Sequence, residues 1–149
     1  MLWLIIAVLI WLIALLIVRF SGLKRLWSAA VWSILISYYL YHFLLEKGFY
    51  YFPEPLYLFQ GIPILFPVAM GGLALILLHF LPEEGGWQLL YLVLSGAVLT
   101  LLELLAQWQG LIYYQNWALY DNFAFKLIIV ITVAKLSNLT IKKQKGYLF

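Results

Sequence analysis

The chain has 149 residues, of which 66% are hydrophobic and 10% are charged. A soluble domain has about 45–50% apolar and about 25% charged residues, so this composition excludes an ordinary soluble fold and indicates an integral membrane protein. The net charge of +3 comes from Lys and Arg residues that cluster as they do beside membrane spans, which argues against nucleic-acid binding. The absence of cysteine excludes disulfides, thiolate metal sites and thiol nucleophiles.

The hydrophobic segments predict an all-α bundle of about five transmembrane helices. The first predicted span covers residues 2–18, close to the lower limit of about 17 residues that a bilayer requires. It lacks the basic start and the small-residue cleavage pattern of a signal peptide, so we expect it to be retained. A basic loop over residues 19–25 separates it from the second predicted span, residues 26–45.

An aromatic segment that contains proline, residues 49–57, follows the second span. Pro cannot continue a regular helix, and aromatic rings favour the headgroup region, so we expect this segment on the membrane surface. The third predicted span covers residues 57–81 and contains Pro63 and Pro67. Since each interior Pro removes a helical hydrogen bond, the sequence predicts a kink in the outer half of this helix.

The fourth and fifth predicted spans cover residues 87–107 and 120–136, and an uncharged aromatic segment, residues 108–119, lies between them. We expect this segment at the same membrane surface as residues 49–57, and in contact with it. Residues 137–149 are predicted to form a basic cytoplasmic tail.

The distribution of Lys and Arg predicts the orientation of the protein. The loop at 19–25 and the C-terminal tail carry three basic residues each, whereas the loop at 46–56 carries only Lys47. Basic residues favour the cytoplasmic side of a membrane. We therefore expect a multi-pass protein of the cell membrane with its N-terminus outside and its C-terminus in the cytoplasm.

Two ionisable residues inside predicted spans are the main candidates for a site. Glu103 lies on one helical stripe with Gly96, Thr100 and Gln107, and we expect this stripe to face other helices. Lys126 lies about 9 Å into the fifth span, at a depth similar to that of Glu103 on the preceding antiparallel helix. An ion pair between the two would lower the insertion cost of about 2.5–3.5 kcal/mol for each charge.

His42 and Gln60 complete a predicted polar cluster in the outer third of the membrane. In one interpretation the cluster is a pocket that opens outward, with Glu103 as a proton or cation ligand and His42 as its partner. In the other, the Glu103–Lys126 pair fixes helix register while His42 and Gln60 reach water. His42 and His79 fall near opposite membrane faces, so the sequence predicts no metal site and no cofactor.

Several short motifs lie between about residues 40 and 136. They are Glu46 and Pro53 after the second span, Phe66-Pro67 in the third, Leu102-Glu103 in the fourth, and Trp117, Tyr120, Phe123 and Lys135 around the fifth. In these motifs the chain resembles a family of small, uncharacterised multi-pass membrane proteins of spore-forming Bacillota, although Lys135 stands where the family pattern has Arg. The resemblance implies a bacterial cytoplasmic membrane, and it implies no activity, substrate or cofactor.

The leading hypothesis is a non-enzymatic membrane protein that acts through contacts with lipid, with a partner membrane protein or with a second copy of itself. The alternative is a small transporter or ion-conducting oligomer that uses the polar site around Glu103. A membrane-embedded enzyme ranks third, because the sequence offers no plausible arrangement of nucleophile, base and orienting acid.

Overall fold

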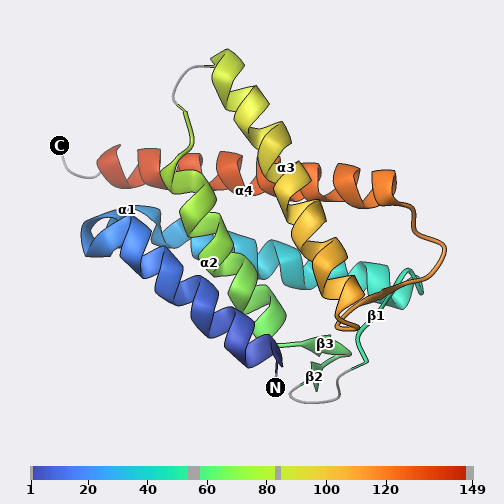
Figure 1. Ribbon diagram of the computed structural model, residues 1–149. Coiled ribbons are helices and arrows are strands. Elements are labelled where there is room, and N and C mark those ends of the chain that lie inside the picture. The colour runs from blue at the N-terminus through green and yellow to red at the C-terminus, as the bar shows by residue number, and fades with distance from the viewer. Residues whose placement is uncertain (1, 54–57, 83–84, 147–149) are drawn as a thin grey trace.

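The computed structural model describes residues 2–53, 58–82 and 85–146, and its main elements are helices (Figure 1). The described helices are α1 (Leu2–Glu46), α2 (Leu65–His79), α3 (Gly85–Trp108) and α4 (Leu119–Gly146). The described strands have two residues each and are β1 (Tyr50–Tyr51), β2 (Leu58–Phe59), β3 (Ile62–Pro63) and β4 (Tyr113–Tyr114). The predicted all-α fold class is confirmed.

Helix α1 covers 45 residues but turns back on itself at Arg19, where φ is 55° and ψ is 168°. We call residues 2–18 the N-limb of α1 and residues 20–46 its C-limb; Figure 1 shows the chain reversing direction between them. The predicted loop over residues 19–25 is wrong in extent, because only Arg19 leaves the helical conformation. A single residue is enough because both limbs can continue their own hydrogen bonding up to the break.

The prediction of five separate spanning helices is also wrong in its count. Within the described residues, three helices are long and apolar enough to cross a membrane, namely α1, α3 and α4. Helix α2 has 15 residues. At about 1.5 Å per residue it is roughly 22 Å long, less than the hydrocarbon core of about 30 Å.

Helix α2 is shorter than predicted because the chain forms a hairpin before it. Residue 57, the predicted start of this span, lies outside the described residues. Strands β2 and β3 pair antiparallel, and the Gln60–Gly61 turn between them has φ of 50° and 84°. Positive φ at both central positions is the geometry of tight hairpin turns. The predicted kink is wrong as well, since Pro67 falls in the first turn of α2, where a backbone N–H has no helical partner.

Both limbs of α1 pack against α2. Trp11 Nε1 of the N-limb donates a hydrogen bond to the carbonyl of Val68 at 2.9 Å, and Ser33 Oγ of the C-limb donates to the carbonyl of Met70 at 2.9 Å. Neighbouring Gly71 and Gly72 permit this approach. A Cβ atom at Gly71 would lie 2.9 Å from Ile34 Cγ1, and one at Gly72 would lie 2.8 Å from Ile10 Cγ2.

Helix α3 packs mainly on α4 and makes few contacts with α1 and α2. The expectation that Gly96 faces another helix is confirmed, because a Cβ atom there would lie 3.6 Å from the backbone of Leu127 in α4. Helix α4 is longer than predicted and continues to Gly146, so the segment expected to be a tail from residue 137 is helical. Residues 147–149 of that predicted tail lie outside the described residues.

The outer faces of the helices are apolar. Exposed Leu, Ile and Val side chains follow the N-limb of α1 and the outer faces of α3 and α4. Examples are Leu4, Val8, Leu12, Leu16, Leu94, Val98, Leu101 and Ile128. An apolar surface of this extent is costly in water and favourable in lipid, so these faces indicate a membrane protein.

Candidate functional site

A buried polar cluster lies where the C-limb of α1, the β1–β4 ribbon, α3 and α4 meet. We call it the Glu103 cluster, and its members are Tyr41, Tyr50, Glu103, Tyr114, Asn122 and Lys126. Its centre is an ion pair between Lys126 Nζ and Glu103 Oε2, with the two side chains only 1% and 4% exposed. The predicted ion pair is therefore present.

The carboxylate of Glu103 has donors on both oxygens. Lys126 and the Tyr41 hydroxyl both donate to Oε2. The hydroxyls of Tyr50 and Tyr114 donate to Oε1 at 2.5 Å and 2.8 Å. A buried carboxylate with this set of donors is fully compensated, so its free energy of burial is much lower than that of an isolated charge.

Asn122 connects the tyrosines of the cluster to α4. Its Nδ2 donates to the Tyr114 hydroxyl at 2.9 Å, and its Oδ1 lies 3.0 Å from the Tyr50 hydroxyl. Asn122 and Lys126 are four residues apart on α4 and therefore share a helical face. Both are buried, so α4 presents one polar patch to the interior of the bundle.

The β1–β4 ribbon brings two of the tyrosines to the carboxylate. The strands pair antiparallel with Tyr50 opposite Tyr114 and Tyr51 opposite Tyr113, and Gln115 N donates to the carbonyl of Phe49 at 2.9 Å. Side chains alternate across a strand, so one pair turns inward and the other outward. Tyr50 is 3% exposed, whereas Tyr51 is 55% exposed. The predicted contact between the two aromatic segments is thus confirmed, and their depth in the membrane stays a prediction.

The pKa values of Tyr50 and Tyr114 are raised above the ordinary value for tyrosine. Burial is the main cause, and the negative charge of Glu103 and the hydrogen bonds to its carboxylate add to it. Both hydroxyls therefore keep their protons and act as hydrogen-bond donors throughout the physiological pH range.

An apolar cleft of about 610 Å³ has both members of the ion pair in its lining. The N-limb of α1, α2 and α3 supply its walls, and Glu103 and Lys126 are among the residues that line it. Trp3 also lines the cleft; it is 6% exposed, and its Nε1 is buried with no hydrogen-bond partner among the described residues. The lining of the cleft thus combines apolar side chains with a buried ion pair and with a tryptophan whose donor has no partner among the described residues.

The other predicted site residues do not join the Glu103 cluster. Thr100 Oγ1 donates to the carbonyl of Gly96 at 2.8 Å, within its own helix. Gln107 lines a separate hollow with Trp108. Gln60 Oε1 accepts a hydrogen bond from Tyr38 at 2.7 Å. Of the polar stripe on α3, Gly96 and Glu103 face Leu127 and Lys126 of α4, and only Glu103 takes part in the cluster.

His42 is also placed elsewhere, with its Nε2 3.4 Å from Glu46 Oε1 and its ring stacked on that of Tyr38. His79, at the far end of α2, lines a different pocket. Over the described part of the chain, no group of three or more His, Asp or Glu side chains is placed to hold a metal ion.

Sequence reasoning missed four members of the cluster, namely Tyr41, Tyr50, Tyr114 and Asn122. The sequence predicts Tyr50 and Tyr114 only as anchors at the headgroup level, because aromatic rings favour that depth, and it assigns no role to Tyr41. Two signals were available. A buried carboxylate requires more than one donor, and Asn122 stands one helical turn before Lys126.

Comparison of the chain with protein-family models, curated proteins and solved structures finds no match. The resemblance to membrane proteins of spore-forming Bacillota therefore stays a prediction, and the function has to be argued from the site itself.

Proposed function

We propose that this multi-pass membrane protein binds a lipid with at least one acyl chain. The lipid would occupy the cleft that has the Glu103–Lys126 pair in its lining. The role is non-enzymatic: the protein holds the lipid and does not transform it. One observation carries the proposal, which is that a buried ion pair lines an otherwise apolar cleft of about 610 Å³. Apolar walls with a few convergent polar groups are typical of sites for such ligands.

The cleft lies within reach of the bilayer. Its lining includes Leu9, Leu102 and Leu105, which are also among the exposed apolar side chains of α1 and α3. In a bilayer, acyl chains surround that surface and can therefore enter a cleft that opens between the helices. Glu103 is five residues from the end of α3, about 8 Å along the helix axis. A lipid whose chain fills the cleft would place its polar linkage near that depth.

Two polar groups in the lining of the cleft, on Trp3 and Lys126, suit a lipid with hydrogen-bond acceptors. Trp3 Nε1 has a proton to donate and no acceptor among the described residues. Lys126 Nζ carries a positive charge that is only partly used by Glu103 and Tyr41, since an ammonium has three donors. Ester carbonyl or phosphate oxygens of such a lipid would supply the acceptors that these groups lack.

The alternative, transport of a cation or proton through Glu103, finds less support in the geometry. A transport carboxylate needs a free oxygen for the ion, whereas both oxygens of Glu103 already accept hydrogen bonds. Lys126 also repels any cation that approaches. In this proposal the Glu103 cluster is therefore a structural part of the cleft and does not bind a transported ion.

The proposal includes an arrangement in the cell membrane. The N-limb, the C-limb, α3 and α4 span the bilayer. The short helix α2 packs against both limbs and brings the chain back to the break in α1, where His79 lies near Gly22. The N-terminus is outside and the C-terminus is in the cytoplasm, because Arg19, Lys24 and Arg25 cluster at the break in α1.

A matched pair of variants on α3 tests the lipid site. Leu102→Trp places a large ring in the lining of the cleft, whereas Leu94→Trp changes the same residue type at an exposed position that does not line it. Protein purified from membranes in mild detergent is extracted, and its bound lipid is quantified by mass spectrometry. We expect Leu102→Trp to lose most of the bound lipid and Leu94→Trp to keep it.

Equal lipid content in the two variants would contradict the proposal. A change of oligomeric state in Leu102→Trp, without a change in bound lipid, would assign the cleft to a second copy of the chain and would also overturn it.

A further inference from the structure

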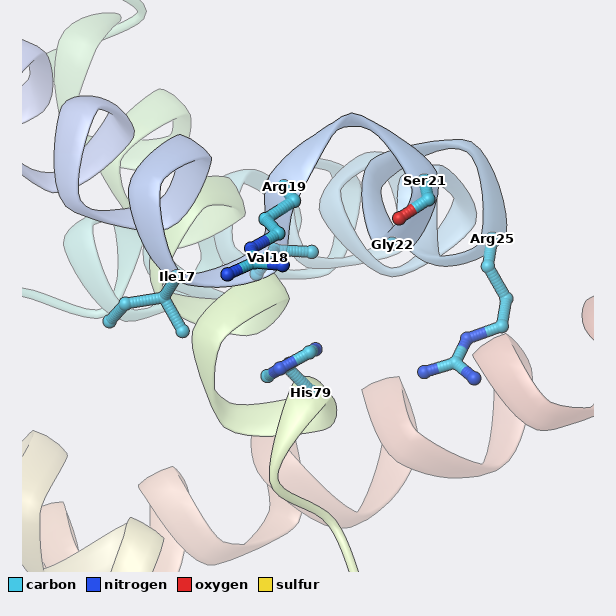
Figure 2. Close-up of a pocket in the computed structure, with 7 residues that line it drawn as sticks. All are labelled: Ile17, Val18, Arg19, Ser21, Gly22, Arg25 and His79. Atoms are coloured by element: carbon cyan, nitrogen blue, oxygen red, sulfur yellow. The ribbon is translucent and has the colours of Figure 1, made fainter.

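A second pocket, of about 510 Å³, lies at the bend of α1, opposite the last turn of α2. It shares no lining residue with the cleft at Glu103. Its polar lining residues are Arg19, Ser21, Arg25 and His79 (Figure 2). Figure 2 shows the Arg19 guanidinium above the His79 ring and the Arg25 guanidinium to its right. The pocket therefore gathers two permanent positive charges and one imidazole.

The charges of the two arginines have no carboxylate partner in the part of the chain that the structure describes. The acidic side chains there are Glu46, Glu103 and Asp121. Glu46 pairs with His42, Glu103 pairs with Lys126, and Asp121 accepts a hydrogen bond from the backbone of Ala118. A pocket with uncompensated guanidinium groups attracts an anion.

His79 provides a further polar atom at the same place. Its Nδ1 is buried and has no hydrogen-bond partner among the described residues. The ring lies against Gly22, where a Cβ atom would be 3.9 Å from Nδ1. A buried imidazole nitrogen without a partner is costly, and the N–H of this ring could donate a hydrogen bond to an anionic oxygen in the pocket.

Arg19 lines the pocket while its backbone adopts an unfavourable conformation. Its φ of 55° and ψ of 168° fall in a region that is almost restricted to glycine. The reversal of the chain alone would be served better by Gly. A ligand contact would explain why position 19 has an arginine in this conformation, beside a second arginine and an unpartnered imidazole.

The surroundings of the pocket indicate the kind of anion. Leu16 and Phe20, which flank Arg19, are 79% and 78% exposed. A pair of guanidinium groups beside exposed apolar side chains is the arrangement found at membrane surfaces, where charge meets headgroups and apolar groups meet chains. Guanidinium groups match the geometry of phosphate oxygens and bind them in pairs. We propose that this pocket binds the phosphate group of an anionic phospholipid in the leaflet that surrounds the bend.

The test uses the full chain, purified in detergent and stripped of lipid, and short-chain phosphatidylglycerol as the probe. Arg25→Gln removes a lining charge, and Lys24→Gln removes the same charge one residue earlier, outside the lining. We expect Arg25→Gln to weaken binding about tenfold, since a hydrogen bond to a charged group contributes at least that factor, and Lys24→Gln to change it less than about twofold. Arg25→Lys keeps the charge but not the paired geometry and should lie between them.

Three further arms complete the experiment. Short-chain phosphatidylcholine should bind more weakly than phosphatidylglycerol, because its net charge is zero. Inorganic phosphate identifies the source of the phosphate group: weak binding supports the lipid, and binding as tight as that of phosphatidylglycerol would overturn the lipid assignment. Glu83→Gln with Glu84→Gln removes two negative charges that follow His79 closely in sequence. Since neither charge could attract an anion, this variant should bind phosphatidylglycerol at least as tightly.

Two results would overturn the site altogether. One is an equal loss of binding in Arg25→Gln and Lys24→Gln, which would indicate a diffuse basic surface. The other is unchanged binding in Arg25→Gln with the fold verified by circular dichroism. This test is independent of the test of the lipid cleft. Leu102→Trp should leave phosphatidylglycerol binding at the bend unchanged, because the two pockets share no lining residue.

Discussion

The hydroxyl of Tyr50 donates a hydrogen bond to Glu103 Oε1 at 2.5 Å, which joins a strand outside the helices to a carboxylate inside α3. This bond connects parts of the chain that are 53 residues apart in sequence. It makes the β1–β4 ribbon part of the buried core, so the ribbon does more than connect helices. A change in the ribbon should therefore be felt in the stability of the whole bundle.

Tyr50→Phe should lower the free energy of unfolding by about 1.5–3 kcal/mol, because it removes a hydrogen bond to a charged acceptor. Tyr51→Phe is the matched control, and as an exposed neighbour it should change stability by less than about 0.5 kcal/mol. Thermal or denaturant unfolding in detergent measures both. Equal stabilities of the two variants would show that the ribbon is not coupled to the core.

Glu103→Leu and Lys126→Met should each destabilise the protein by about 3–5 kcal/mol, because each leaves the other charge buried without its partner. The double variant should recover much of the loss, since it leaves no unpaired charge. Glu103→Gln should be milder than Glu103→Leu, because an amide oxygen still accepts from the tyrosines. Additive losses in the double variant would contradict a direct interaction between the two side chains.

Arg19→Gly should raise the free energy of unfolding by about 1 kcal/mol, because the backbone conformation at the break costs an arginine about 1–3 kcal/mol that glycine avoids. Ser21→Gly, in the helical part just after the break, should have the opposite sign and cost about 0.5 kcal/mol. The two unfolding midpoints, compared with that of the natural chain, measure the difference. A destabilised Arg19→Gly protein would mean that contacts of the side chain outweigh the backbone term.

The topology can be tested by single-cysteine labelling, since the natural chain contains no cysteine and gives no background. Ser21→Cys should react only with reagents that reach the cytoplasm, and Tyr51→Cys should react with impermeant reagents from outside. Both positions are exposed, so access is decided by the side of the membrane. Labelling of both positions from the same side would exclude a crossing by the C-limb of α1.

The raised pKa values of Tyr50 and Tyr114 predict a loss of stability in alkali. In the unfolded chain these tyrosines lose their protons near pH 10, whereas the folded protein retains them. The folded state therefore binds more protons above about pH 10, and its stability falls as the pH rises further. Unfolding measured at pH 8 to 11 should show this fall, and Tyr50→Phe with Tyr114→Phe should make it shallower.

Hydropathy was a good guide to which segments are helical and a poor guide to where the helices end. The residues before Leu65 are apolar, and apolar character alone does not separate a helix from a short hairpin. The turn at Gln60–Gly61 was the available signal, because Gly tolerates positive φ, but a glutamine before it gave little indication. The break at Arg19 had no signal of that kind, since arginine is rarely found in that conformation.

The candidate site was predictable only in its costliest part. A charge inside a span is conspicuous, so Glu103 and Lys126 could be paired from their depth alone. Two of the tyrosine donors, Tyr50 and Tyr114, come from strands of two residues each, and pairing of strands that short depends on tertiary contacts that a sequence does not display. His42 and Gln60 were grouped with Glu103 by depth, but depth does not fix the direction in which a side chain points.

Gly71 and Gly72 have a consequence for the biogenesis of the protein. They receive the C-limb and the N-limb of α1, respectively, on a helix of 15 residues that is short for a stable insertion signal. Both limbs precede α2 in the chain, so we expect the surface that accepts α2 to be in the membrane before α2 arrives. The order of the segments is thus part of the assembly route, and a circular permutant that presents α2 to the translocon first should insert poorly.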